Sequence, residues 1–119
     1  MSLSVSIVDD DAGSRGATAS LVRSLGLSVE TFGSAREFLD SRAPTTTACL
    51  ITDIHMPEIT GLELQGRLRA LRPDCPVIVV TGYPTPAVHD MAIEGGAIGF
   101  FAKPLGANFL TCLEDRLIA

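Results

Sequence analysis

Aspartates follow two of the short apolar segments of this sequence. Asp9, Asp10 and Asp11 come after the first segment, and Asp53 comes after a later one. Clustered carboxylates bind hard divalent cations, and Mg²⁺ prefers a few protein oxygens together with water and phosphate oxygens. A carboxylate is also a nucleophile towards phosphoryl groups, with which it forms an aspartyl phosphate. If the fold brings the two segments together, these acids predict a site for magnesium-assisted phosphoryl transfer.

Two other polar residues stand at the ends of apolar segments. Thr81 follows the run at 77–80, and Lys103 lies just after the run at 98–101. A lysine binds phosphoryl oxygens as a point charge, and a threonine hydroxyl donates one more hydrogen bond. Each residue alone reads as an ordinary turn or surface residue, but together with the acids they indicate one common site.

The apolar segments have the length and composition of β-strands. The run Val77-Ile78-Val79-Val80 is continuous and β-branched, which is typical of parallel strands that are buried on both faces. We expect strands at residues 4–8, 29–32, 48–52, 77–80 and 98–101.

Helical patterns lie between the strands. The pairs Ser34/Glu37 and Thr60/Glu63 have the spacing of a capping box, and Thr85-Pro86 is a third start signal. Apolar residues at helical spacing follow each start. Glycine or proline follows the helices that end near Gly26, Pro73 and Gly95-Gly96.

Five strands that alternate with five helices predict an α/β fold with one parallel sheet covered on both faces. The flavodoxin-like, doubly wound strand order 2-1-3-4-5 accommodates five such units. Ligands of these sheets bind beyond the carboxyl ends of the strands, at the switch point, here between the first and third strands. This order would bring Asp9–Asp11 beside Asp53. We expect a single domain over residues 1–119.

Four segments, each at the end of an expected strand, form one set. They are Ile7-Val8-Asp9-Asp10-Asp11, Asp53-Ile54-His55-Met56-Pro57 with Gly61 following, Val79-Val80-Thr81-Gly82, and Phe101-Ala102-Lys103-Pro104. Together they resemble the CheY-like receiver domains of two-component response regulators, over essentially the whole chain. Thr81-Gly82-Tyr83, the pair Gly96-Ala97 and the Phe-x-Lys-Pro ending resemble one subgroup, the FixJ/NarL-like receivers, although Leu105-Gly106 replaces a more usual aromatic residue.

The resemblance implies a metal-assisted phosphoacceptor. Asp53 accepts the phosphoryl group. Asp10 and Asp53 bind Mg²⁺ directly, Asp9 helps through water, and His55 contributes its backbone carbonyl and not its imidazole. Asp11 receives no such role.

It also implies the residues that respond to phosphorylation. Lys103 and Thr81 contact the phosphoryl group, and Thr81 and Phe100 form the switch, although Phe100 can equally be a plain core residue. The Lys103-Pro104 bond is usually cis in the family, which would aim the lysine into the site. His89 is expected on the exposed face of the fourth helix.

As a function, the resemblance implies a signalling switch and not an enzyme. A sensor histidine kinase or a phosphotransfer protein donates the phosphoryl group to Asp53. The face formed by the fourth helix, fifth strand and fifth helix then rearranges and controls an output, here transcription. The family is cytoplasmic, and phosphorylation can bring about homodimerisation. Any output domain would lie outside this chain.

Composition agrees with these expectations. The net charge is −5 and the basic residues are scattered, whereas a nucleic-acid surface needs clustered Lys and Arg. We expect no signal peptide and no contact with a membrane, because no apolar stretch is long enough to span a bilayer. The wide spacing of Cys49, Cys75 and Cys112 predicts reduced, mostly buried thiols.

Three other functions are open to the same residues. A haloacid-dehalogenase-type phosphatase also forms an aspartyl phosphate, but it has a second Asp two residues after the nucleophile, where this sequence has His55. A phosphorylation-independent receiver usually lacks an acid or the lysine, and this chain keeps all of them. A flavin- or dinucleotide-binding protein would carry a glycine-rich loop after the first strand.

Overall fold

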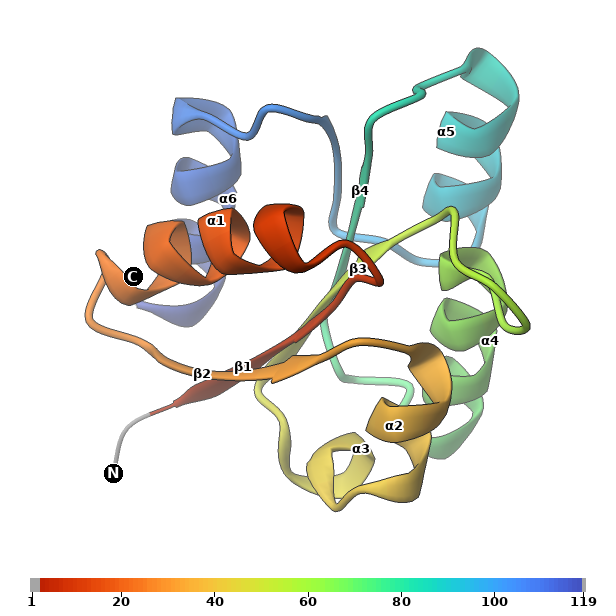
Figure 1. Cartoon of the computed structure of the whole chain (residues 1–119), viewed down its shortest axis with the longest axis horizontal. Helices are drawn as coiled ribbons and strands as arrows, with labels where there is room; N and C mark the ends of the chain where they lie inside the picture. Colours follow the sequence, from red (N-terminus) through yellow and green to blue (C-terminus); the bar gives the residue numbers. More distant parts are fainter. Residues whose placement is uncertain (1–2, 119) are drawn as a thin grey trace.

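The computed structural model of the chain describes residues 3–118 (Figure 1). Within this range, strands and helices alternate along the chain as the sequence predicts, except that two helices, and not one, lie between the second and third strands. The strands are β1 (Ser4–Val8), β2 (Ser28–Phe32), β3 (Cys49–Asp53), β4 (Val77–Thr81) and β5 (Gly99–Ala102). The helices are α1 (Ala12–Arg23), α2 (Ala35–Asp40), α3 (Ala43–Thr46), α4 (Gly61–Leu71), α5 (Pro86–Glu94) and α6 (Ala107–Leu117).

All neighbouring strands pair in parallel, in the order β2-β1-β3-β4-β5. This confirms the predicted fold class and strand order. The register pairs Val8 of β1 with Thr52 of β3, and Asp53 with Val80 of β4. The residues that follow β1 and β3 therefore emerge side by side at the carboxyl edge of the sheet, at its switch point.

Helices cover both faces of the sheet (Figure 1). Helices α1 and α6 lie on one face, where Val22, Phe109 and Leu113 pack with Ile7 and Ile51 of the strands. Helices α2, α3, α4 and α5 lie on the other, where they bury a second cluster around Phe38, Leu64 and Leu68. Every residue of β3 and of β4 is buried, as expected of central parallel strands.

The helix starts are capped where the sequence predicts. The side chains of Ser34, Thr60 and Thr85 each accept a hydrogen bond from the backbone N–H three residues later. Asp11 does the same for Ser14 and caps α1. The Lys103–Pro104 bond is cis, as the resemblance implied.

One helix, α3, was not predicted from the sequence. Its four residues are too few to show a helical period. Pro44 stands in its first turn, where its fixed φ favours a helical start, and Ala43 and Pro44 are buried. The other differences are one-residue shifts at strand ends.

The cysteines agree with the expectation of reduced, mostly buried thiols. Cys49 and Cys75 are buried, Cys112 is half-buried, and all three are free thiols. Burial raises the pKa of each thiol, which keeps it neutral. Among residues 3–118, none of the helices combines the length and the apolar character needed to cross a membrane.

Candidate functional site

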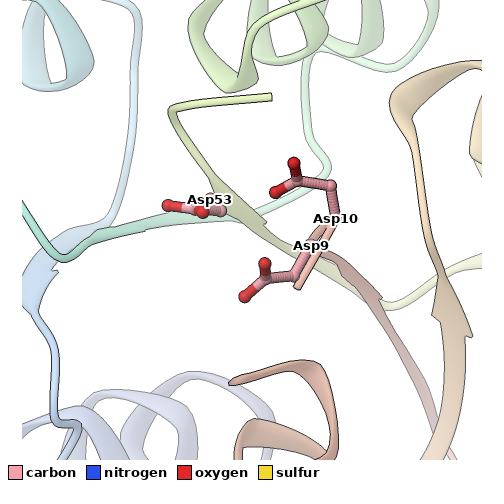
Figure 2. A group of neighbouring side chains, drawn as sticks. All are labelled: Asp9, Asp10 and Asp53. Carbon is pink, nitrogen blue, oxygen red and sulfur yellow. The ribbon is translucent and has the colours of Figure 1, made fainter. Parts of the chain in front are cut away.

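Three carboxylates meet at the carboxyl edge of the sheet (Figure 2). Asp9 and Asp10 follow β1, and Asp53 ends the neighbouring β3. One oxygen from each carboxylate lies within 4.8 Å of the other two. Asp9 and Asp53 are buried, whereas Asp10 is exposed. Three carboxylate oxygens this close together form a donor set that fits a hard divalent cation such as Mg²⁺.

Lys103 provides a positive charge beside these acids. Its Nζ donates to Asp9 Oδ2 over 2.9 Å and lies 3.4 Å from Asp53 Oδ2. Burial opposes the charge of the ammonium, but the hydrogen bond to Asp9 and the charges of both acids outweigh it and raise the pKa of Lys103. Lys103 therefore stays protonated and reaches the two acids from a position 94 residues after Asp9.

Asp53 is a buried carboxylate whose negative charge is only partly offset by neighbouring groups. Burial raises the pKa of Asp53, and the charge of Asp9 adds to this effect. Lys103 and the backbone N–H of Ile54, which donates to Asp53 Oδ1 over 2.9 Å, act in the opposite direction. Asp53 Oδ2 is thus the oxygen that faces the lysine.

A cavity of about 290 Å³ opens over Asp53. Its walls come from the loops after β1, β3, β4 and β5, which is the arrangement expected at a switch point. The rings of His55 and Tyr83 both line this cavity and contact each other edge to face, with centroids 5.9 Å apart. The lining residues are Asp11, Ser14, Asp53, His55, Gly82, Tyr83 and Lys103.

The structure does not bring the two predicted switch residues against the acids. Thr81 is fully buried at the end of β4, and its Oγ1 accepts a hydrogen bond from the Tyr83 backbone N–H over 3.0 Å. Phe100 is half-buried on β5 and its ring contacts that of His89 on α5, with centroids 5.2 Å apart. The ring of His89, expected to be plain surface, is half-exposed and covers part of Phe100.

The sequence did not predict a role for Arg15 at this site. Its Nη1 donates to the backbone carbonyl of Asp9 over 2.8 Å, so a cation stands directly behind the acids. The only available signal was its place in the first turns of the helix after Asp11, which does not distinguish it from an exposed helical arginine.

Comparison with known proteins agrees with this geometry. The family model described as "Response regulator receiver domain" matches residues 5–112. The response regulator protein TodT of Pseudomonas putida is 44% identical over 98 residues, which cover 82% of this chain and 43% of TodT. The transcriptional regulatory protein FixJ of Azorhizobium caulinodans is 41% identical over 103 residues, which cover 87% of this chain and 49% of FixJ.

The fold comparison gives the same result. The chemotaxis protein CheY4 of Vibrio cholerae superposes with a TM-score of 0.87 at 26% identity, covering 98% of this chain and all of that one. The chain spans about half the length, or less, of the two regulators, so their whole-protein activities extend beyond the part compared. Because the family model covers nearly the whole chain and the acids, the threonine and the lysine stand at its strand ends, this chain belongs to the response regulator receiver domains, with CheY-like architecture and FixJ-like sequence.

Proposed function

We propose that this domain accepts a phosphoryl group on Asp53 from a sensor histidine kinase or a phosphotransfer protein and thereby switches an output. The observation that carries the proposal is the convergence of Asp9, Asp10 and Asp53 within 4.8 Å, with Lys103 hydrogen-bonded to the same group. Phosphoryl transfer to a carboxylate uses such a set, with acids that bind a metal ion, an acid that accepts the phosphoryl group and a cation beside it.

The transfer is a displacement at phosphorus. Asp53 Oδ2 attacks the phosphorus, the bond from phosphorus to the donor's nitrogen or oxygen breaks, and the leaving group keeps the electron pair. Asp9, Asp10, Asp53 and the backbone carbonyl of His55 would hold Mg²⁺, which supplies positive charge to the phosphoryl oxygens when bound. Lys103 already stands 3.4 Å from Asp53 Oδ2, where its ammonium can bind a phosphoryl oxygen.

The response begins at Thr81. Its hydroxyl oxygen is held by the Tyr83 N–H, but its own hydrogen is free to donate to a phosphoryl oxygen on the adjacent strand end. Movement of Thr81 towards Asp53 makes room for Phe100 to leave His89 and turn inward. The face formed by α5, β5 and α6 then rearranges and controls the output, through homodimerisation and transcription.

Family membership separates this proposal from two alternatives. Receiver domains are signalling switches, so the phosphatase and the flavin-binding functions do not apply. On this proposal the domain catalyses only its own phosphorylation and dephosphorylation. Its partners are the kinase or phosphotransfer protein, without direct contact to nucleic acid or membrane. Three neutral free thiols agree with a cytoplasmic location.

Phosphorylation by a small donor tests the proposal against a phosphorylation-independent receiver. The wild-type domain, treated with acetyl phosphate and Mg²⁺, should gain one phosphoryl group by intact-mass measurement. Asp53→Asn should gain none, because the amide is no nucleophile towards phosphorus. Asp74→Asn, at an exposed acid between α4 and β4, is the matched control and should be modified like wild type. A phosphoryl group on Asp53→Asn would sink the assignment.

A further inference from the structure

Two hydrogen bonds hold the backbone of Asp9, one at its N–H and one at its carbonyl. The N–H of Asp9 donates to the carbonyl of Phe32 at the end of β2, over 3.1 Å. The carbonyl of Asp9 accepts from Arg15 Nη1 over 2.8 Å. A guanidinium donor makes a charge-assisted hydrogen bond, which is stronger than one between neutral groups. Arg15 on α1 therefore anchors the first residues after β1.

The orientation of the peptide group between Asp9 and Asp10 decides where Asp10 lies. A peptide unit is planar, so fixing the carbonyl of Asp9 also fixes the N–H and Cα of Asp10. The carboxylate of Asp10 is exposed, and within residues 3–118 no hydrogen bond or ion pair holds it. Its place in the carboxylate group depends on the backbone alone.

Asp9 differs from Asp10 in this respect. Asp9 Oδ1 accepts from the Asp11 backbone N–H over 3.0 Å, and Asp9 Oδ2 accepts from Lys103. The carboxylate of Asp9 keeps its two partners when Arg15 is removed, whereas the peptide that leads into Asp10 loses the hydrogen bond from Arg15 to its carbonyl. The consequence of losing Arg15 should thus appear at Asp10.

We propose that Arg15 is a positioning residue for the metal site: by holding the Asp9 carbonyl, it orients the Asp10 carboxylate towards Mg²⁺. This inference rests on the proposed function, in which Asp10 binds the metal directly. Residues that orient metal ligands from behind change metal affinity by about 10- to 100-fold when they are removed.

Electrostatics alone predicts the opposite result. Arg15 carries a permanent positive charge close to three carboxylates, so its removal makes the site more negative. By Coulomb's law a more negative site attracts a cation more strongly. Positioning predicts weaker Mg²⁺ binding and charge alone predicts tighter binding, so the sign of the change separates the two.

The experiment is a titration of the metal-free domain with Mg²⁺, followed by backbone amide NMR shifts. Arg15→Met should weaken Mg²⁺ binding about tenfold or more. Arg15→Lys keeps the charge and one donor, and it should recover most of the affinity. Arg23→Met removes the same charge from an exposed position at the end of α1 and should bind Mg²⁺ like wild type. Asp10→Ala is the reference for a lost ligand.

The outcomes are distinct. Mg²⁺ binding by Arg15→Met that is as tight as, or tighter than, that of wild type overturns the inference. Thermal unfolding without metal checks that the variants fold. If Arg15→Met does not fold, Arg15→Ala, which also removes the donor, replaces it under the same criterion. Absence of Mg²⁺ binding by the wild-type domain would instead overturn the proposed metal site.

Discussion

Asp53 illustrates at the residue scale how a reactive group differs from a stabilising one. Its carboxylate is buried, and burial raises its pKa despite the nearby Lys103. A carboxyl group whose pKa is higher in the folded state than in the unfolded chain is easier to protonate when folded. The ionised form of Asp53 therefore lowers the free energy of unfolding. Groups with such perturbed pKa values are common at functional sites, where the perturbation serves reactivity.

This cost has a defined pH window. Above the raised folded-state pKa, Asp53 is charged in both states and destabilises the fold. Below the unfolded value of about 3.9, it is protonated in both states and the cost disappears. We expect Asp53→Asn to raise the melting temperature of the metal-free domain at neutral pH, with a gain that shrinks as the pH falls through the raised folded-state pKa and is gone below about 3.9.

Calorimetry of the two proteins across this range checks the expectation. Asn can still accept the hydrogen bond from the Ile54 N–H, so the variant changes charge more than contacts. Asp74→Asn, at an exposed acid, should show no such pH-dependent gain. A lower melting temperature for Asp53→Asn at neutral pH would mean that Lys103 more than compensates the burial.

His55 and Tyr83 are placed to determine the lifetime of the phosphorylated state. Their rings meet edge to face over the cavity that contains Asp53, although Tyr83 is 77% exposed. Water must approach phosphorus opposite the Asp53 oxygen, and bulky rings hinder that approach. The double change His55→Ala with Tyr83→Ala should speed dephosphorylation severalfold without preventing phosphorylation.

The measurement is phosphate release over time from domain phosphorylated with acetyl phosphate, with Mg²⁺ present. Each single variant should lie between wild type and the double variant, because either ring shields part of the cavity. An unchanged or slower rate in the double variant would show that both rings face solvent during hydrolysis.

At the scale of elements, the start of α4 determines where the loop after β3 passes. Gly61 donates its N–H to the carbonyl of Ile54 over 2.9 Å. A Cβ on Gly61 would overlap the backbone carbonyl of Asp53, which cannot move without shifting the phosphoacceptor. Gly66, one turn further along the same helix, faces open space.

These two glycines should respond to alanine with opposite signs. Gly61→Ala should lower the free energy of unfolding by about 3 kcal/mol or more, since backbone overlap is among the severe single-site effects. Gly66→Ala should raise it by about 1 kcal/mol, because alanine favours a helix interior. Urea denaturation measures both. Equal, small effects would mean that the loop after β3 yields easily.

At the scale of the whole molecule, one sheet joins two apolar layers. Leu64 of α4 lies in the layer on one face and Leu113 of α6 in the layer on the other, and both are fully buried. The strands between them contribute side chains to both layers, so neither layer can unfold while the other remains intact.

Truncation in either layer should therefore destabilise the whole domain. Leu64→Ala and Leu113→Ala should each lower the free energy of unfolding by about 2–5 kcal/mol and keep one cooperative transition. Differential scanning calorimetry distinguishes this from layer-wise melting. A second heat-absorption peak in either variant would contradict the single-unit description.

The sequence by itself determined the strands, most of the helices, the strand order and the set of acids. These features depend on local or repetitive patterns, such as the β-branched run of β4 and the capping pairs Ser34/Glu37 and Thr60/Glu63. The motif that ends each strand could be identified because a parallel α/β sheet collects all of its carboxyl ends at one edge.

Only the tertiary structure decided which groups meet at that edge. Three contacts leave no local pattern in the sequence. They are the hydrogen bond from Arg15 to the Asp9 carbonyl, the hydrogen bond from the Tyr83 N–H to Thr81 and the ring contact of His89 with Phe100. Each depends on a side-chain direction or on the packing of separate elements. For Lys103 and Asp9, 94 residues apart, the sequence predicted a common site, but which oxygen the ammonium binds was decided only where β5 and β1 end at the same edge of one sheet.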